Sequence, residues 1–280
     1  MIVRIGSWPV DLDLRAPLPV HRWLPWLQRH ETDGPAVVSV RVVPDRNADA
    51  ATFLEDLLRL QGLAPGPGRL VRCAGPAIEA RVPEGLVETL DRTGAPRLLN
   101  ILLCAAFNLA RASRQRDEVL FHAAALVADG GVVLATGPSG AGKSTLAGLA
   151  RPGQVLHDEA VALSTDGEGR ILARGTPLLG SLVGEGPLDP LPVRRVALLE
   201  HGSANRRRRI APVGAVPDLL PQIFRLSVPF PSSRDLALEA EARLHWASRL
   251  ASSIPVESFS FAPEPSAVPA LLGEGSGERS

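Results

Sequence analysis

The chain has 280 residues, no net charge at neutral pH and 45% hydrophobic residues. This length suits one large domain or two small ones, and this hydrophobic content is sufficient for a substantial core. A balanced charge creates no global field that would attract nucleic acid or an anionic membrane, so we expect neither as a partner. The longest apolar run, 98–110, is too short to span a bilayer.

The first 115 residues predict a small α+β domain. Residues 37–43 are rich in β-branched side chains, which favours a strand, and residues 51–60 have the apolar spacing of a helix. Further along this part we expect a turn cluster at 65–68, a hairpin formed by 69–73 and 77–82, and helices at 83–92 and 95–112. A polar run then places the domain boundary near residue 115.

The second part, residues 116–272, predicts an α/β domain that carries the chemistry. Two apolar strands, 123–128 and 132–136, are joined by Asp129-Gly130-Gly131, which is a hairpin signal. The second of these strands therefore has an antiparallel neighbour, which favours a mixed sheet. We expect further elements in chain order: a helix at 143–150, strands at 154–157, 159–164, 170–174 and 196–200, helices at 218–226 and 237–253, and a disordered tail at 273–280.

The only lysine of the chain, Lys143, lies in a complete G-x-x-x-x-G-K-[ST] pattern between a predicted strand and a predicted helix. Such a loop is a P-loop: its backbone N–H groups cradle phosphates, its lysine reaches the β- and γ-phosphates, and the following hydroxyl, here Ser144, binds Mg²⁺. A Gly-rich surface turn would not explain the isolated lysine. The residues expected to contact ATP are Gly137, Ser139, Gly140, Ala141, Gly142, Lys143, Ser144 and Thr145.

Two adjacent acids, Asp158 and Glu159, follow the predicted strand that returns from the loop. Neighbouring residues of a regular strand point to opposite faces, so both acids reach the phosphates only if the strand ends there. The pair predicts a ligand for Mg²⁺, a proton acceptor, or both. The alternative is one functional acid beside one structural carboxylate.

Three further features are ambiguous. His122 opens the first strand of the hairpin, where a lone histidine is more often structural. His157 precedes the acid pair and is a second candidate. The run Arg206 to Arg209 is either a charged edge strand or an arginine clamp for phosphate or for an acidic acceptor.

Taken together, these features resemble the HPr kinase/phosphorylase family, which shares the fold of phosphoenolpyruvate carboxykinase. The matching residues are Phe121 to Ala125, the Asp129-Gly130-Gly131 hairpin, Gly137 to Thr145, Val155 to Glu159, Gly175-Thr176-Pro177, Leu198 to Gly202 and Asn205-Arg206. The family's later Glu-Ile-Arg-Gly signature is absent, so the resemblance does not extend to its phosphorylase activity, its HPr substrate or its hexamer. Kinases that phosphorylate serine in lasso-peptide precursors are of similar size and also lack this signature.

The resemblance implies a mixed-sheet P-loop kinase domain and a role for each matching residue. Asp158 matches the general base, Glu159 matches a second acid that helps to hold Mg²⁺, and His122 matches a histidine near the transferred phosphate. With Lys143 these residues form the expected catalytic set. Ser144, Asp158 and Glu159 form the expected metal set.

We therefore expect an ATP- and Mg²⁺-dependent cytoplasmic kinase acting on a hydroxyl, most simply a serine of a peptide or small protein. The N-terminal domain is expected to recognise the acceptor, and a homo-oligomer is left open. A small-molecule kinase on the same fold and a nucleotide-binding regulator without catalysis also remain open. A transporter-type ATPase fits poorly, because the chain has no Leu-Ser-Gly-Gly-Gln sequence.

Overall fold

The computed structural model describes residues 1–15, 24–61, 63, 68–89, 94–114, 117–180, 186–224 and 233–273. Within them the chain is of mixed α/β class and forms two compact units. Unit 1 comprises Met1–Asp117, Pro177–Leu179 and Arg225–Glu241, and unit 2 comprises Glu118–Thr176, Gly180–Phe224 and Ala242–Ser280. The predicted boundary at residue 115 lies outside the described residues, as do the turn cluster at 65–67 and positions 274–280 of the predicted tail.

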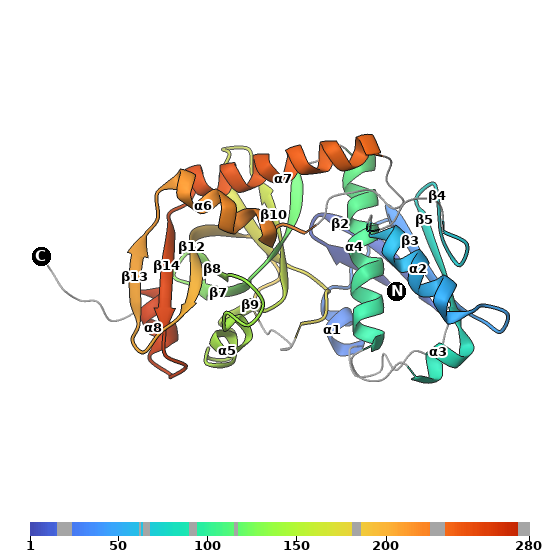
Figure 1. Ribbon diagram of the computed structural model, residues 1–280, viewed down its shortest axis with the longest axis horizontal. Coiled ribbons are helices and arrows are strands. Elements are labelled where there is room, and N and C mark those ends of the chain that lie inside the picture. Colours follow the sequence, from blue (N-terminus) through green and yellow to red (C-terminus); the bar gives the residue numbers. More distant parts are fainter. Residues whose placement is uncertain are drawn as a thin grey trace, which may run out of the picture. The chain divides into compact units, whose positions relative to one another are not determined.

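Unit 1 contains a five-stranded mixed sheet in the order β1-β2-β3-β5-β4. The predicted strand at 37–43 and the predicted hairpin are confirmed as β3, β4 and β5, and the predicted helices at 51–60 and 95–112 as α2 and α4. The elements are β1 (Ile2–Ile5), β2 (Trp8–Leu14), α1 (Leu24–Arg29), β3 (Val38–Asp45), α2 (Ala50–Leu60), β4 (Val71–Ala74), β5 (Ala77–Pro83), α3 (Glu84–Thr89) and α4 (Gly94–Arg114). Figure 1 shows α2 and α4 beside the strands of this sheet.

Three elements of unit 1 are not among those predicted, namely β1, β2 and α1. One predicted boundary is also wrong, because Pro83 is the last residue of β5 and not the first of a helix. Pro83 lies opposite Asp45 at the end of the parallel β3–β5 ladder. Proline has no N–H to donate, so a strand end is a position at which it is tolerated.

Unit 2 is built on a larger mixed sheet with the path β6-β10-β11-β12-β8-β7-β9, extended by β14 and β13 beside β12. The elements up to β11 are β6 (Glu118–His122), β7 (Ala124–Ala128), β8 (Gly131–Thr136), α5 (Lys143–Gly148), β9 (Val155–His157), β10 (Ala160–Thr165) and β11 (Ile171–Gly175). The later elements are β12 (Leu191–His201), β13 (Arg206–Arg209), α6 (Pro212–Leu219), the 3-10 turn Leu220–Gln222, α7 (Ser233–Ser253), β14 (Val256–Phe261) and α8 (Ala267–Leu272). The residues of α7 are divided between the two units.

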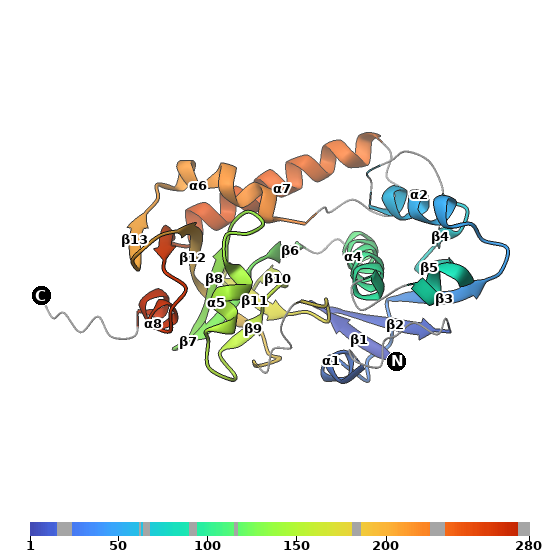
Figure 2. The ribbon, with the colours of Figure 1, turned by 60° about the horizontal axis from the view of Figure 1, so that its bottom comes forward.

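The loop after β8 is anchored at the centre of the sheet, because β8 is an interior strand. Every residue of β8 is buried, as expected for a strand that is covered on both faces. It pairs antiparallel with β7 and parallel with β12, so the predicted mixed sheet is confirmed. On one face, residues of α5 and α8 pack with β8, β12 and β14 into one hydrophobic cluster. Figure 2 shows α5 and α8 on that side of the strands and α6 on the other.

Two sequence-based expectations for unit 2 are corrected. His122 does not open the hairpin strand: it ends the separate strand β6, which pairs with β10, whereas β7 pairs with β8. The chain thus changes strand partner at Ala123. The helix expected at 218–226 is wrong: α6 spans Pro212–Leu219, with proline in its first turn, a 3-10 turn covers Leu220–Gln222, and Ile223 and Phe224 are not helical.

Among the helices of the described ranges, none is long and apolar enough to cross a membrane.

Candidate active site

The loop between β8 and α5 closes around the side chain of its own lysine. Lys143 is buried, and its ammonium donates hydrogen bonds to the carbonyl oxygens of Gly137 at 2.7 Å and Pro138 at 3.1 Å. Burial lowers the pKa of Lys143, and the nearby carboxylate of Glu159 opposes this effect. The loop therefore surrounds the partly desolvated ammonium of Lys143, and such a positive charge favours the binding of an anion.

Glycine is required at the end of this loop for two independent reasons. Gly142 has φ +97°, which residues with a side chain rarely adopt. A Cβ atom built on it would also lie 2.7 Å from Cζ of Phe261. Phe261 stacks on Phe259 within the hydrophobic cluster under the loop, so it has little freedom to move away.

A contact that the sequence analysis did not foresee holds the middle of the loop. Nε2 of His201, at the end of β12, lies 2.9 Å from the carbonyl oxygen of Gly140. With its proton on Nε2, this ring donates to the carbonyl. His201 lies 61 positions from Gly140 in the chain, and only the parallel pairing of β12 with β8 brings the two together.

The structure brings His122 to the loop through its neighbouring strands. The hydroxyl of Thr136, the last residue of β8, donates to the carbonyl oxygen of His122 at 2.6 Å. The ring of His122 packs edge-on against Phe224. Burial, and secondarily the charge of Lys143, lower its pKa to about 4. His122 is therefore neutral at pH 7 in the ligand-free protein.

The acid pair lies where β9 ends, which is the condition for both acids to reach the site. Asp158 and Glu159 occupy the bend between β9 and β10. His157 organises this bend, because its Nδ1 accepts hydrogen bonds from the backbone N–H groups of Glu159 and Ala160, both at 3.0 Å. This assigns a structural role to His157, which the sequence left open as a candidate site residue.

The two acids have different surroundings. Glu159 Oε2 lies 4.0 Å from Nε2 of His122, but the neutral imidazole makes no ion pair with it at pH 7. Burial raises the pKa of Glu159, the adjacent charge of Asp158 raises it further, and Lys143 opposes both. Asp158 is buried, and a Cβ atom built on Gly180 would lie 2.0 Å from its Oδ1. The backbone at Gly180 thus packs directly on the carboxylate of Asp158.

The donor set fits Mg²⁺. The hydroxyl of Ser144 is on an exposed residue at the start of α5, and the acid pair supplies carboxylate oxygens, with the charge of Asp158 raising the pKa of Glu159. Mg²⁺ prefers oxygen ligands, and a cation between such acids would relieve their repulsion. Within the described ranges, no group of three or more His, Cys, Asp or Glu residues is arranged to hold a metal by itself. Mg²⁺ commonly takes few protein ligands and completes its shell with substrate phosphates and water.

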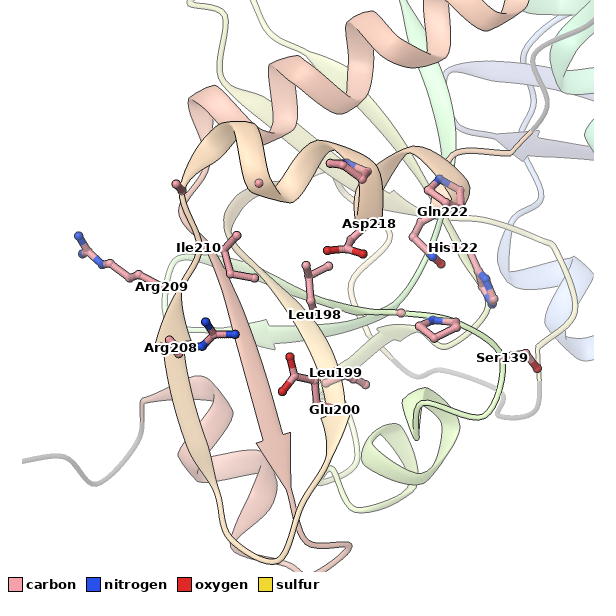
Figure 3. Close-up of a pocket in the computed structure, with 16 residues that line it drawn as sticks. His122, Ser139, Leu198, Leu199, Glu200, Arg208, Arg209, Ile210, Asp218 and Gln222 are labelled. Carbon is pink, nitrogen blue, oxygen red and sulfur yellow. The ribbon is translucent and has the colours of Figure 1, made fainter.

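A cavity of about 920 Å³ lies beside the first residues of the loop, within unit 2. One wall comes from Gly137 to Ser139 and His122, a second from β12 and β13, and a third from α6 and the 3-10 turn that follows it. Figure 3 shows Arg208 pointing inward beside Glu200 and Asp218 facing the cavity from α6. Arg209 also borders the cavity, but its side chain points away from it.

Strand pairing separates the four arginines that the sequence could not rank. Arg208 lies opposite Ser258 of β14, and Ser258 lies opposite Leu198 of β12, so these side chains share the face that borders the cavity. Arg207 and Arg209 lie on the other face, where both act on the carboxylate of Glu257. Of the run, Arg208 is therefore the candidate for ligand contact.

A scan against protein-family models finds no match to this chain, and a search of curated proteins finds none either.

Proposed function

We propose that the chain is an ATP- and Mg²⁺-dependent kinase that transfers the γ-phosphoryl group to a hydroxyl, most simply that of a serine in a peptide or small protein. The observation that carries the proposal is the convergence of Lys143, His122 and Glu159 at the end of β8, next to a cavity large enough for an acceptor. The resemblance to HPr kinase-type enzymes supports it independently, through the order of the same residues along the chain.

The chemistry requires positioning and charge neutralisation more than covalent participation by the protein. The ammonium of Lys143 exchanges its contacts with Gly137 and Pro138 for the β- and γ-phosphates. Ser144, Asp158 and Glu159 would hold Mg²⁺, which would neutralise charge on the phosphates. His122, neutral and with its Nε2 4.0 Å from Glu159 Oε2, would donate a hydrogen bond from its Nε2–H to a phosphoryl oxygen.

In the transfer step, the acceptor oxygen forms a bond to the γ-phosphorus while the bond from that phosphorus to the β–γ bridging oxygen breaks. Asp158 accepts the proton of the acceptor hydroxyl, and ADP leaves with the electron pair of the broken bond. The carboxylate of Asp158 is buried, which suits a general base that is shielded from bulk water. Glu159 has a raised pKa and faces Lys143, so the two acids must be tested separately.

The test is intact-mass spectrometry of peptides encoded beside this gene, incubated with ATP, Mg²⁺ and the protein. A gain of one phosphoryl group is expected, and Asp158→Asn is expected to lower its rate by about 10²- to 10⁴-fold, the usual contribution of a general base. Glu159→Gln is expected to act mainly by raising the Mg²⁺ concentration that is needed.

Nucleotide binding is measured in parallel by calorimetry, with Lys143→Ala as the negative control. ATP binding without phosphorylation of any peptide would argue against a peptide kinase, and would favour a small-molecule acceptor or a regulatory role. An unchanged rate in Asp158→Asn would refute its role as base.

A further inference from the structure

The cavity beside the loop lies at the end where the terminal phosphate of ATP would be bound. Lys143, whose ammonium serves the β- and γ-phosphates in a P-loop, contacts the carbonyl groups of Gly137 and Pro138. The described lining of the cavity includes Gly137 to Ser139 and His122, but not the first residues of α5, Lys143 to Thr145. The acid pair Asp158 and Glu159 is not part of this lining either, so among the proposed site residues the cavity borders the start of the loop and His122. An occupant of this cavity would therefore meet the transferred phosphoryl group and not the nucleoside.

The charges on the walls select the kind of occupant. Arg208 faces the cavity with Glu200 on the same wall and Asp218 on another (Figure 3). Two carboxylates would repel a polyphosphate or a second nucleotide more strongly than a single carboxylate, because the repulsion grows with the charge of the occupant. One guanidinium can bind a single carboxylate in a bidentate manner. The remaining walls include Leu198, Ile210 and Pro217, which suit apolar groups.

Arg208 is available for such a contact. It is exposed, and among the described residues no carboxylate lies within ion-pairing distance of it. Arg209, its neighbour in the chain, lies on the opposite face and acts instead on Glu257. A guanidinium that makes no ion pair with a described residue and points into a cavity keeps its capacity to bind a ligand.

We propose that this cavity is the acceptor site, and that Arg208 selects an acceptor peptide in which a carboxylate, from an acidic residue or a free C-terminus, lies near the phosphorylated serine. The inference rests on the proposed kinase function and names the substrate class of that site. The peptide places its serine hydroxyl at the Gly137–Ser139 end of the cavity and its carboxylate at β13. Its apolar groups lie against the wall formed by Leu198, Ile210 and Pro217.

The test uses seven-residue peptides with a central serine in an alanine–glycine background. One other position carries Asp, Asn or Lys at increasing distance from the serine, and each peptide is made as the free acid and as the C-terminal amide. We expect at least one acidic peptide to have a kcat/KM about ten- to hundredfold above its neutral counterpart, the usual effect of a hydrogen bond to a charged group. Arg208→Gln should abolish this preference, and Arg208→Glu should transfer it to the lysine peptide.

Arg209→Gln is the matched control, because it removes the same charge one residue further along on the other face. It should keep the preference of the unmodified protein, and ATP affinity should be unchanged in both glutamine variants. Equal losses in Arg208→Gln and Arg209→Gln, or no preference for an acid in the unmodified protein, would overturn the inference while leaving the kinase function intact. So would weaker ATP binding in Arg208→Gln alone, because it would place Arg208 at the nucleotide. If ATP binds but no peptide is phosphorylated, the proposed function fails and this inference fails with it.

Discussion

At the scale of single residues, the proposed site contains three groups whose pKa values are shifted from their ordinary values, mainly by burial. His122 is neutral, Lys143 is partly desolvated and Glu159 holds its proton more tightly than an exposed glutamate. Such shifts cluster at functional sites because burial and neighbouring charges are both needed to produce them. They also make the site sensitive to pH.

The shift of His122 predicts a specific dependence of stability on pH. Its pKa is about 4 in the folded protein, against an ordinary value of 6.5 in the unfolded chain. Between these values the unfolded chain binds a proton that the folded protein does not, so stability rises as pH rises through this window and falls as pH is lowered. Urea unfolding at several pH values should show that His122→Asn reduces this slope by up to about 1.4 kcal/mol per pH unit. Parallel pH curves for the two proteins would contradict the neutral state of His122.

His201 provides a second prediction at this scale. Removing its contact with the carbonyl group of Gly140 should loosen the loop without removing any proposed phosphate ligand. We expect His201→Ala to weaken ATP binding about five- to tenfold, which is the usual effect of losing one hydrogen bond. The activity at saturating ATP should be unchanged. Calorimetry and saturation kinetics measure the two effects. A fall in kcat with unchanged ATP affinity would instead indicate a role in the chemistry.

At the scale of elements, two close contacts join the connection between β11 and β12 to β9 and to the bend that follows it. Gly180 packs on the side chain of Asp158 in this bend, and Gly186 donates its N–H to the carbonyl of Val155, the first residue of β9, at 3.1 Å. The position of Asp158 therefore depends on a residue more than twenty positions away in the chain.

A methyl group at position 180 tests this dependence. The Cβ atom of Gly180→Ala would lie 2.0 Å from Asp158 Oδ1, so either the carboxylate or the backbone must shift. We expect phosphoryl transfer to fall by about two orders of magnitude, in line with the effect of displacing a catalytic group by about 1 Å, and ATP binding to be kept. Gly167→Ala is the control, because a Cβ atom at that turn meets no atom within 4 Å. Full activity in Gly180→Ala would show that Asp158 tolerates displacement.

In unit 1, one buried carboxylate joins α2 to β4. Asp56 accepts hydrogen bonds from the backbone N–H groups of Arg69, Leu70 and Val71, and from the side chain of Arg59. Burial acts to raise the pKa of Asp56, but these donors outweigh it, and the pKa is lowered. The stabilisation is therefore present above the ordinary pKa of an aspartate and is lost as pH falls.

Asp56→Asn should consequently destabilise unit 1 by about 3 kcal/mol at pH 7. The amide NH₂ of the asparagine would face backbone N–H groups that now donate to the carboxylate, and two donors cannot form a hydrogen bond with each other. Chemical unfolding followed by circular dichroism measures this loss. Glu55→Gln is the neighbouring control, since Glu55 pairs with Arg59 in an exposed position, where ion pairs contribute little. Similar losses in the two variants would contradict the central role of Asp56.

At the scale of the whole molecule, the chain forms two compact units, and every residue of the proposed site belongs to unit 2. Hydrogen exchange should therefore slow in Gly137 to Thr145 and in β9 when Mg²⁺ and ATP are added. The strands β1 to β5 of unit 1 should be unaffected. A ligand present at a hundred times its dissociation constant stabilises the bound state by about 2.7 kcal/mol, which is ample for detection.

Lys143→Ala is the control for this experiment and should show no protection at any nucleotide concentration used. Slower exchange throughout unit 1 would show that nucleotide binding is coupled to both units. Adding an acceptor peptide then tests the proposed recognition role of the N-terminal domain, because protection in unit 1 is expected only if the peptide contacts it.

The sequence alone determined the features that are local in the chain. The loop from Gly137 to Thr145, the hairpin before it and the acid pair after it were all placed correctly, because turn glycines, apolar alternation and a short helix act between near neighbours. The mixed character of the sheet followed from the hairpin. The regular helices α2, α4 and α7 were predicted to within a few residues of their ends.

Tertiary structure decided what depends on the choice of strand partner. The pairing of β6 with β10 places His122 beside Glu159, and the pairing of β13 with β14 turns Arg208 toward the cavity and Arg209 away. The contacts of His201 with Gly140 and of Gly180 with Asp158 likewise join residues that are distant in the chain. The sequence pattern of a strand shows which residues share a face. Which part of the protein that face contacts depends on the neighbouring strands, so these contacts are seen only in the folded chain.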